Sequence, residues 1–179
     1  SGAEKFAHFL HDENGLKIVS MQSILFGRTE NIFGTEQEYS ILVNYMKKAI
    51  DFATALKCGN LVFGCPKNRK MGDKSRYVTA VKFFSEIGEY AKSKGTTVSI
   101  EANPSIYGTD FVNTTEQAVQ LIKDVSPSLL GLNLDFGTII QNGEDVGTLN
   151  LEFVNHVHIS EPQLAPIVRR AEHEILFRR

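Results

Sequence analysis

Apolar residues recur along the chain with two different periods, which predicts alternating strands and helices. Short apolar or alternating runs are typical of strands, and they cover residues 16–23, 61–63, 97–101, 130–135 and 153–159. Longer stretches repeat apolar residues every three or four positions, as helices do, and they cover residues 38–56, 77–94, 116–123 and 163–179. Residues 6–10 read as the end of a further helix, and residues 136–152 as one short helix or none. Connections of this length between strands predict parallel crossovers in an α/β fold.

Three of the predicted strands have one aliphatic face and one small or polar face. Val98 and Ile100 fall on the aliphatic face of the strand that ends in Glu101. The opposite faces carry Thr97, Ser99 and Glu101; Gly131, Asn133 and Asp135; and Val154, His156 and His158. A doubly wound sheet lies beneath helices on both faces, so both faces should be aliphatic. A polar inner face indicates a barrel instead.

Each polar face ends in a side chain that can bind a metal ion. Glu101, Asp135 and His158 stand at the carboxyl ends of three successive strands, and such ends meet at the mouth of a parallel barrel. Taken alone, each residue is more typical of a cap or a buried hydrogen-bonded group than of a metal ligand. Together, two carboxylates and an imidazole predict a site for a divalent ion such as manganese, magnesium, cobalt or zinc.

Composition narrows the class of protein. A chain of 179 residues that is 42% hydrophobic fits one globular domain, residues 1–179, with its own core. The formal net charge of −2 does not indicate the basic surface that is typical of a nucleic-acid-binding protein, so we expect no nucleic-acid partner. No apolar run approaches the length of a membrane span and no signal peptide is visible, so we expect a cytoplasmic protein with no membrane partner. Cys58 and Cys65 lack metal-ligand spacing and are expected in the core.

Four motifs carry a family resemblance. They are residues 62–69 (VFGCPKNR), 100–104 (IEANP), 132–135 (LNLD) and 156–161 (HVHISE). In order and spacing they resemble the xylose isomerase-like TIM barrel superfamily of sugar phosphate isomerases and epimerases, which also contains endonuclease IV. The resemblance covers residues from about 15 to about 170. It implies an incomplete (β/α) TIM barrel of about five parallel strands with outer helices, corresponding to strands 3–7 of the eight.

The resemblance also implies an activity and a set of roles. Glu101, Asp135 and His158 match three of the four metal ligands, and Glu101 matches one of the two bases that move a substrate proton between adjacent carbons through an enediolate. The expected function is a metal-dependent isomerase or epimerase of a sugar or sugar phosphate. The remaining residues expected to bind substrate are Gln22, Asn103, Lys67, Arg69, His156 and Glu161. Of these, Gln22 and Asn103 would meet sugar hydroxyls. Lys67 and Arg69 would hold a phosphate or acid group, unless they form a solvated basic loop.

The chain departs from the family pattern in two ways. Thr138 stands where many members carry a histidine, which argues against the endonuclease branch. Strands one, two and eight have no counterpart, so the second catalytic glutamate is expected to be missing and the chain to be inactive alone. Open sheet edges would favour a homo-oligomer. The alternatives are a non-catalytic sugar- or metal-binding module and a nuclease of abasic sites.

Overall fold

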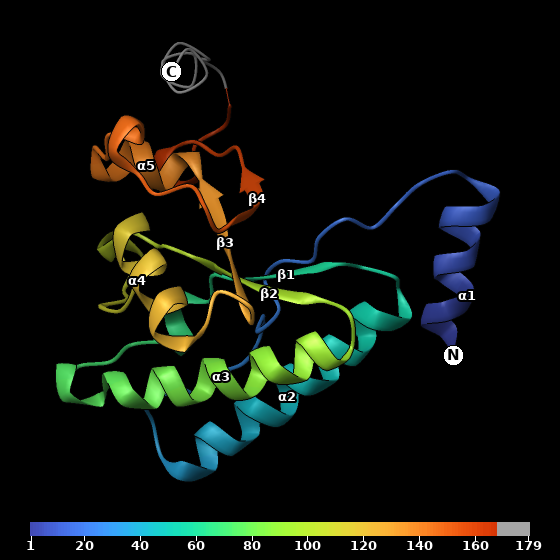
Figure 1. The fold of residues 1–179 in the computed structure, drawn as a ribbon, viewed down its shortest axis with the longest axis horizontal. Coiled ribbons are helices and arrows are strands. Elements are labelled where there is room, and N and C mark those ends of the chain that lie inside the picture. The colour runs from blue at the N-terminus through green and yellow to red at the C-terminus, as the bar shows by residue number, and fades with distance from the viewer. Residues whose placement is uncertain (168–179) are drawn as a thin grey trace.

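A computed structural model describes residues 1–167. Its centre is a parallel sheet of β1 (Asn60–Phe63), β2 (Thr97–Glu101), β3 (Leu130–Asp135) and β4 (Val154–His158), in the order β1-β2-β3-β4. The sheet curls into a half-barrel with the helices outside it, as an incomplete TIM barrel requires (Figure 1). The predicted fold class is thereby confirmed.

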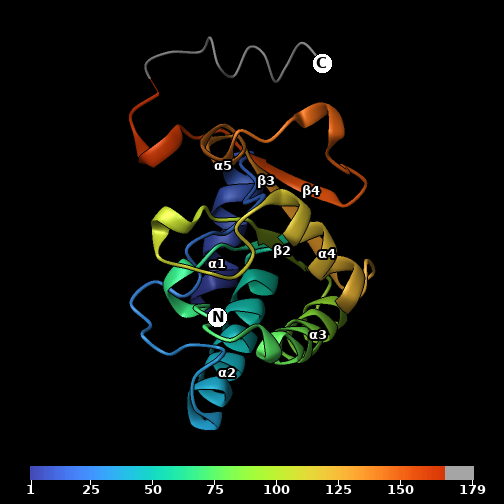
Figure 2. The same ribbon diagram turned by 90° about the vertical axis from the view of Figure 1, so that its left-hand side faces the viewer.

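Most of the helices begin where the sequence places a capping residue; the helix Tyr77–Ser93, which starts after Arg76, has no side-chain cap. The long helices are α2 (Glu36–Ala55), α3 (Tyr77–Ser93) and α4 (Thr115–Val125), and the short ones are α1 (Gly2–His8), which runs into the π-helix Phe9–Glu13, and α5 (Phe136–Asn142). Thr35 opens α2 with a capping box, and Thr114 accepts a hydrogen bond from the third residue of α4. The helices α2 and α3 run side by side beneath β1 and β2 (Figures 1 and 2).

The core lies between the sheet and these helices. Val98 and Ile100 of β2 are fully buried, as is Phe84 of α3. Phe84 packs edge-on against Phe63 of β1, with ring centroids 5.0 Å apart. Register pairs Ile100 with Leu132 of β3, so the aliphatic faces of neighbouring strands align. The predicted outer faces of β2 and β3 are confirmed.

Residues 16–23 do not form the predicted strand. Only Met21 pairs, in a single bridge to Leu61 that the Met21 amide and carbonyl close at 2.9 Å and 2.7 Å. Leu16 and Val19 are 58% and 67% exposed. Within the described residues nothing pairs with the other side of this segment, so its apolar alternation buries little surface. Ser23 then turns the chain with a left-handed backbone (φ 54°).

The predicted inner face of β4 needs one correction. A register shift pairs Leu132 with Val154 but Asn133 with His156, which leaves Asn155 as a bulged residue. Val154 therefore packs against the outer core, and Asn155 takes the inward position. His156 and His158 keep the predicted inner orientation, opposite Asn133 and Asp135.

An inner polar layer joins the strands below their carboxyl ends. Ser99 donates to Asn60 Oδ1 at 2.6 Å, and Asn155 Nδ2 donates to the same oxygen at 2.8 Å and to Ser99 Oγ at 3.0 Å. Gly131 of β3 leaves room for this layer, because a Cβ there would lie 2.7 Å from Asn155 Cβ and 2.8 Å from Ser99 Oγ. The interior of the half-barrel is thus polar, as the strand pattern predicts.

The predicted C-terminal helix, residues 163–179, lies mostly outside the described residues. Its described part is a short 3₁₀ turn, Pro162–Leu164. None of the helices within residues 1–167 combines the length and hydropathy needed to cross a membrane.

Candidate functional site

A pocket of about 440 Å³ opens at the carboxyl ends of β2, β3 and β4. Glu101, Asp135 and His158 all line it. The other lining residues are Gln22, Ser23, Asn103, Tyr107, Thr138, Val157, Ile159, Ser160 and Leu164. The pocket therefore lies where a parallel α/β barrel presents its chemistry.

The three predicted metal ligands converge in this pocket. One ligand atom from each of Glu101, Asp135 and His158 lies within 4.8 Å of the other two. The closest pair is His158 Nδ1 and Glu101 Oε2, 2.8 Å apart. All three side chains are half-buried, so water and small ligands can reach them.

The three side chains lie close enough together to bind one divalent ion after Asp135 moves toward the other two. Two ligand atoms about 2.1 Å from one ion and at right angles to each other lie about 3 Å apart, close to the 2.8 Å between His158 and Glu101. A third ligand cannot lie opposite both of these atoms, so Asp135, whose ligand atom lies within 4.8 Å of each, must approach at least one of them to about 3 Å when an ion binds. Two carboxylate oxygens and one imidazole nitrogen are a donor set that suits manganese, cobalt or zinc, and magnesium less well.

Neighbouring groups hold both oxygens of the Glu101 carboxylate. Asn133 Nδ2 lies 2.5 Å from Oε2 and 3.1 Å from His158 Nδ1, and Asn103 Nδ2 donates to Oε1 at 3.1 Å. Gly64, just beyond β1, makes space for this carboxylate, because a Cβ there would lie 2.9 Å from Oε1. The position of the carboxylate is therefore fixed before any ligand binds.

Asp135 is held from two sides. Its Oδ1 accepts the Thr138 amide at 2.7 Å as the N-cap of α5, and Ser160 Oγ lies 3.0 Å from both carboxylate oxygens. Burial raises the pKa of Asp135, and the charge of Glu101 adds to the shift, while the Thr138 amide opposes it. Thr138 also donates its hydroxyl to the Ala102 carbonyl at 3.1 Å.

The two histidines of β4 are shifted in opposite directions. The hydrogen bond to Glu101 raises the pKa of His158, although burial opposes it. Burial lowers the pKa of His156, and the neighbouring His158 adds to this. The two rings lie edge to face with centroids 5.1 Å apart. The shifts therefore favour the neutral form of His156 and the protonated form of His158.

Only some of the residues predicted to bind substrate line the pocket. Gln22 lines the pocket, and Asn103 lines it although only 7% of it is exposed. His156 lies on the inner face beside His158. Lys67 is exposed and lines a neighbouring cavity, and Glu161 follows β4 without lining the pocket.

The prediction for Arg69 needs correction. The side chain is fully buried and lines none of the cavities described here, so it cannot hold a phosphate in this structure. Its Nη2 atom donates to the Glu101 carbonyl at 3.0 Å and to Asn103 Oδ1 at 2.8 Å. Because these hydrogen bonds hold the Arg69 side chain inside the fold, it is neither exposed to a phosphate in the cavities nor part of a solvated loop.

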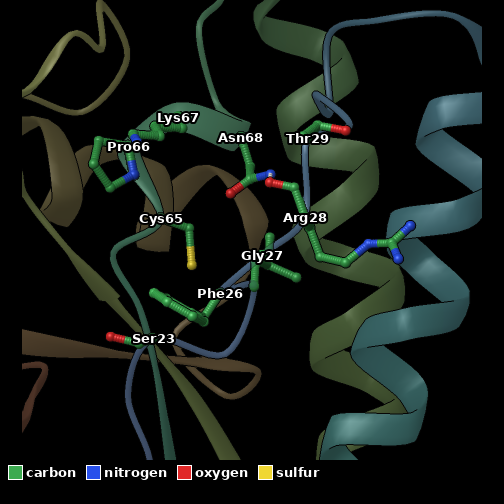
Figure 3. Close-up of a pocket in the computed structure, with 10 residues that line it drawn as sticks. Ser23, Phe26, Gly27, Arg28, Thr29, Cys65, Pro66, Lys67 and Asn68 are labelled. Carbon is green, nitrogen blue, oxygen red and sulfur yellow. Dashed lines mark hydrogen bonds between the residues drawn. The ribbon is translucent and has the colours of Figure 1, made fainter.

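A second cavity of about 500 Å³ adjoins the first through Ser23. Figure 3 shows its two walls, residues 23–29 and residues 65–68, with the Cys65 side chain directed toward the segment that carries Phe26. Phe26 is 88% exposed at this rim. Burial raises the pKa of the Cys65 thiol to about 11, so it stays protonated at neutral pH. Lys67 is the cationic group of this cavity that no described salt bridge neutralises.

Sequence reasoning missed several residues at the site. Asn133 and Ser160 contact the predicted ligands, and Ser23 and Tyr107 line the pocket. The strand pattern identifies Asn133 only as a polar inner residue, although its position two residues before Asp135 places it on the same face as the predicted ligand. Tyr107 ends a short 3₁₀ helix, Ser105–Tyr107, whose position relative to the strands depends on the folded structure.

Comparisons with known proteins agree with this architecture. The family model described as "Xylose isomerase-like TIM barrel" matches residues 2–176. Curated protein sequences give no significant match.

Similar solved structures include 3-keto-D-glucoside 4-epimerase from E. coli (TM-score 0.68, 16% identity, covering 98% of this chain and 75% of that one). D-psicose 3-epimerase in the presence of D-fructose has a TM-score of 0.75 at 15% identity, covering 99% of this chain and 65% of that one. IOLI protein with a bound zinc atom has a TM-score of 0.70 at 16% identity, covering 93% and 59%. At these identities the likeness shows the fold alone, and the chain spans little more than half the length of several neighbours. The match of the family model over nearly the whole chain shows that this protein belongs to the xylose isomerase-like TIM barrel family.

Proposed function

We propose that the pocket is the metal-dependent proton-transfer site of a sugar or sugar phosphate isomerase or epimerase. The observation that carries the proposal is the convergence of Glu101, Asp135 and His158 within 4.8 Å of one another at the carboxyl ends of adjacent strands. Structural neighbours with the same fold are named as sugar epimerases, which supports this class of substrate.

Each residue has a distinct part in the proposed reaction. Glu101, with one face toward the pocket, takes a proton from the substrate carbon beside a carbonyl, which gives an enediolate. Asn133 and Asn103 keep the carboxylate aligned for that transfer. Gln22 lines the pocket where a sugar hydroxyl would lie. A divalent ion held by Glu101, Asp135 and His158 would polarise the substrate oxygens and stabilise the developing negative charge.

The adjoining cavity is suited to the part of the substrate that does not react, such as a phosphate or acid group. It opens beside the proton-transfer pocket at Ser23 and offers Lys67 at its rim. We propose that Lys67 is the contact for a phosphate or acid group, in place of the buried Arg69.

Hydrogen exchange at the substrate carbon tests the proposal, because it needs only one base. The 179-residue chain is incubated with manganese and D-fructose, D-allulose or D-fructose 6-phosphate in D₂O, and loss of the C3 proton signal is followed by NMR. We expect metal-dependent exchange that Glu101→Gln abolishes. Glu116→Gln, on the exposed first turn of α4, is the matched control and should leave exchange unchanged.

Three outcomes would redirect the assignment. Manganese binding by calorimetry without exchange of any of these sugars would favour a non-catalytic binding module. No manganese binding at millimolar concentration would refute the metal site itself. Cleavage of an abasic-site duplex would indicate the nuclease alternative.

We also propose that the chain self-associates. Leu16 and Val19 at one edge of the half-barrel, and Val157 and Ile159 at the other, are each more than 40% exposed. Such apolar edges are usually covered. Light scattering at micromolar concentration should give a mass above that of the monomer, and a monomer mass would contradict this.

A further inference from the structure

Arg69 is a buried cation that the proposed reaction does not use. Its side chain is fully buried, and no carboxylate of the described residues lies within ion-pair distance of it. Burial lowers its pKa to about 10, so it remains charged at neutral pH. Burying an unpaired charge is expensive, and such a residue in a folded protein calls for an explanation.

The contacts of Arg69 converge on the end of β2. Besides the Glu101 carbonyl and Asn103 Oδ1, its Nη2 atom reaches the Val112 carbonyl at 3.5 Å. Its Nε and Nη1 atoms have no hydrogen-bond partner among the described residues. The two shorter hydrogen bonds of the guanidinium therefore go to the segment that carries Glu101 and Asn103, and the longest goes to Val112.

A guanidinium decides which way the Asn103 amide faces. Arginine only donates hydrogen bonds, so the oxygen of the Asn103 amide must face it. The amide nitrogen then faces the opposite way, where it donates to Glu101 Oε1 at 3.1 Å and to the Ala102 carbonyl at 3.0 Å. The reversed amide would place its nitrogen against a cation and its oxygen against a carboxylate, which is unfavourable at both ends.

We propose that Arg69 is a positioning residue that acts through Asn103 to orient the Glu101 carboxylate. With Asn103 on Oε1 and Asn133 on Oε2, both oxygens of Glu101 are held, and Arg69 fixes the oxygen end of the first of these amides. The assignment of Glu101 as base and ligand rests on the proposed function. The orientation of the amide does not.

The side-chain amide of Asn103 provides a readout that needs no metal. In the metal-free chain, its NMR signal is identified by its absence in Asn103→Asp, and its hydrogen exchange is measured. We expect slow exchange in the wild type, at least tenfold faster exchange in Arg69→Met, and a value within about threefold of wild type in Arg69→Lys, which keeps a cationic donor. A merely structural role would not separate the two variants in this way.

Manganese affinity gives the second readout. Misorienting a ligand through its supporting shell typically weakens metal binding about 10–100-fold, so we expect such a loss in Arg69→Met and recovery in Arg69→Lys. Asn113→Ala is the matched control. It loosens the same loop by removing hydrogen bonds to the Asn103 and Thr109 carbonyls, at 2.9 Å and 3.1 Å, without touching the Asn103 amide. It should lower the melting temperature and leave manganese affinity unchanged.

The outcomes separate this inference from the proposed function. Unchanged exchange of the Asn103 amide in Arg69→Met would overturn the inference, whether or not the protein binds metal. Equal losses in Arg69→Met, Arg69→Lys and Asn113→Ala would also overturn it. Failure of the wild type to bind manganese would refute the metal site alone. If Arg69→Met does not fold, Arg69→Gln takes its place: it should weaken manganese binding in the otherwise wild-type chain but add no further loss in an Asn103→Ala background, since coupled residues are not additive; additive losses would overturn the inference.

Discussion

Replacing Gly64 with alanine should disturb the site while sparing the fold. A Cβ at residue 64 would lie 2.9 Å from Glu101 Oε1, whereas ordinary van der Waals contact begins at 3.4 Å. The carboxylate oxygen must therefore retreat by about 0.5 Å, which is the tolerance of a preorganised site. The nearest atom is the end of a flexible side chain, so the free energy of unfolding should fall by less than about 1 kcal/mol.

The displacement of the Glu101 carboxylate in Gly64→Ala should weaken metal binding. Loss of ligand alignment costs about 10–100-fold in affinity, which is about 1.4–2.8 kcal/mol. Isothermal titration calorimetry with Mn²⁺ measures this, and chemical unfolding of the metal-free chain measures stability.

Gly59, at the other end of β1, is the matched control. A Cβ there meets no atom within 4 Å, and its backbone lies outside the left-handed region. Gly59→Ala should bind Mn²⁺ as the wild type does and be as stable, or more stable by about 0.4–1 kcal/mol. If Gly64→Ala binds Mn²⁺ within twofold of wild type, the placement of the Glu101 carboxylate is wrong.

Three further substitutions test other parts of the structure. Glu101→Gln should lower the pKa of His158 in the metal-free chain, because their hydrogen bond raises it; NMR titration checks this. A raised histidine pKa stabilises the fold fully below about pH 6.5 and loses that contribution as pH rises through the folded value, so wild type should lose more stability than Glu101→Gln between pH 6 and pH 8. Gly131→Ala should cost about 1–3 kcal/mol in urea unfolding by overpacking against Asn155, and a neutral result would contradict that contact. Phe84→Ala should cost about 3–5 kcal/mol, and a loss below 1 kcal/mol would place the residue outside the core.

The alternation of apolar and polar side chains predicted β2 and β3, which each pair with another strand on both sides. In β2 and β3 every second residue is aliphatic and buried, and the remaining positions carry the site, so the pattern defines both faces. Glu101 and Asp135 could be located for this reason. Residues 16–23 have the same pattern, but a strand also requires a partner, and pairing with residues far along the chain cannot be inferred from periodicity.

Two features depend on contacts that no local pattern encodes. The bulge at Asn155 changes which residues of β4 face inward, and it follows from register against β3 rather than from the residues of β4 alone. Arg69 sits among polar loop residues, which is typical of an exposed position. Its burial results from acceptors more than thirty residues away, at Glu101, Asn103 and Val112.

The polar layer formed by Asn60, Ser99 and Asn155 has a consequence for how the strands find their alignment. A one-residue shift in the register of β1 or β2 would put Leu61 in the place of Asn60 or Val98 in the place of Ser99. The polar groups that now bond to that side chain would lose this hydrogen bond, at a cost in stability. Parallel strands brought together by helical crossovers have no tight turn to set their offset. The hydrogen bonds among Asn60, Ser99 and Asn155 can set that offset instead, because they form in only one register. Glu101, two residues after Ser99, is then aligned with the pocket residues of the neighbouring strands.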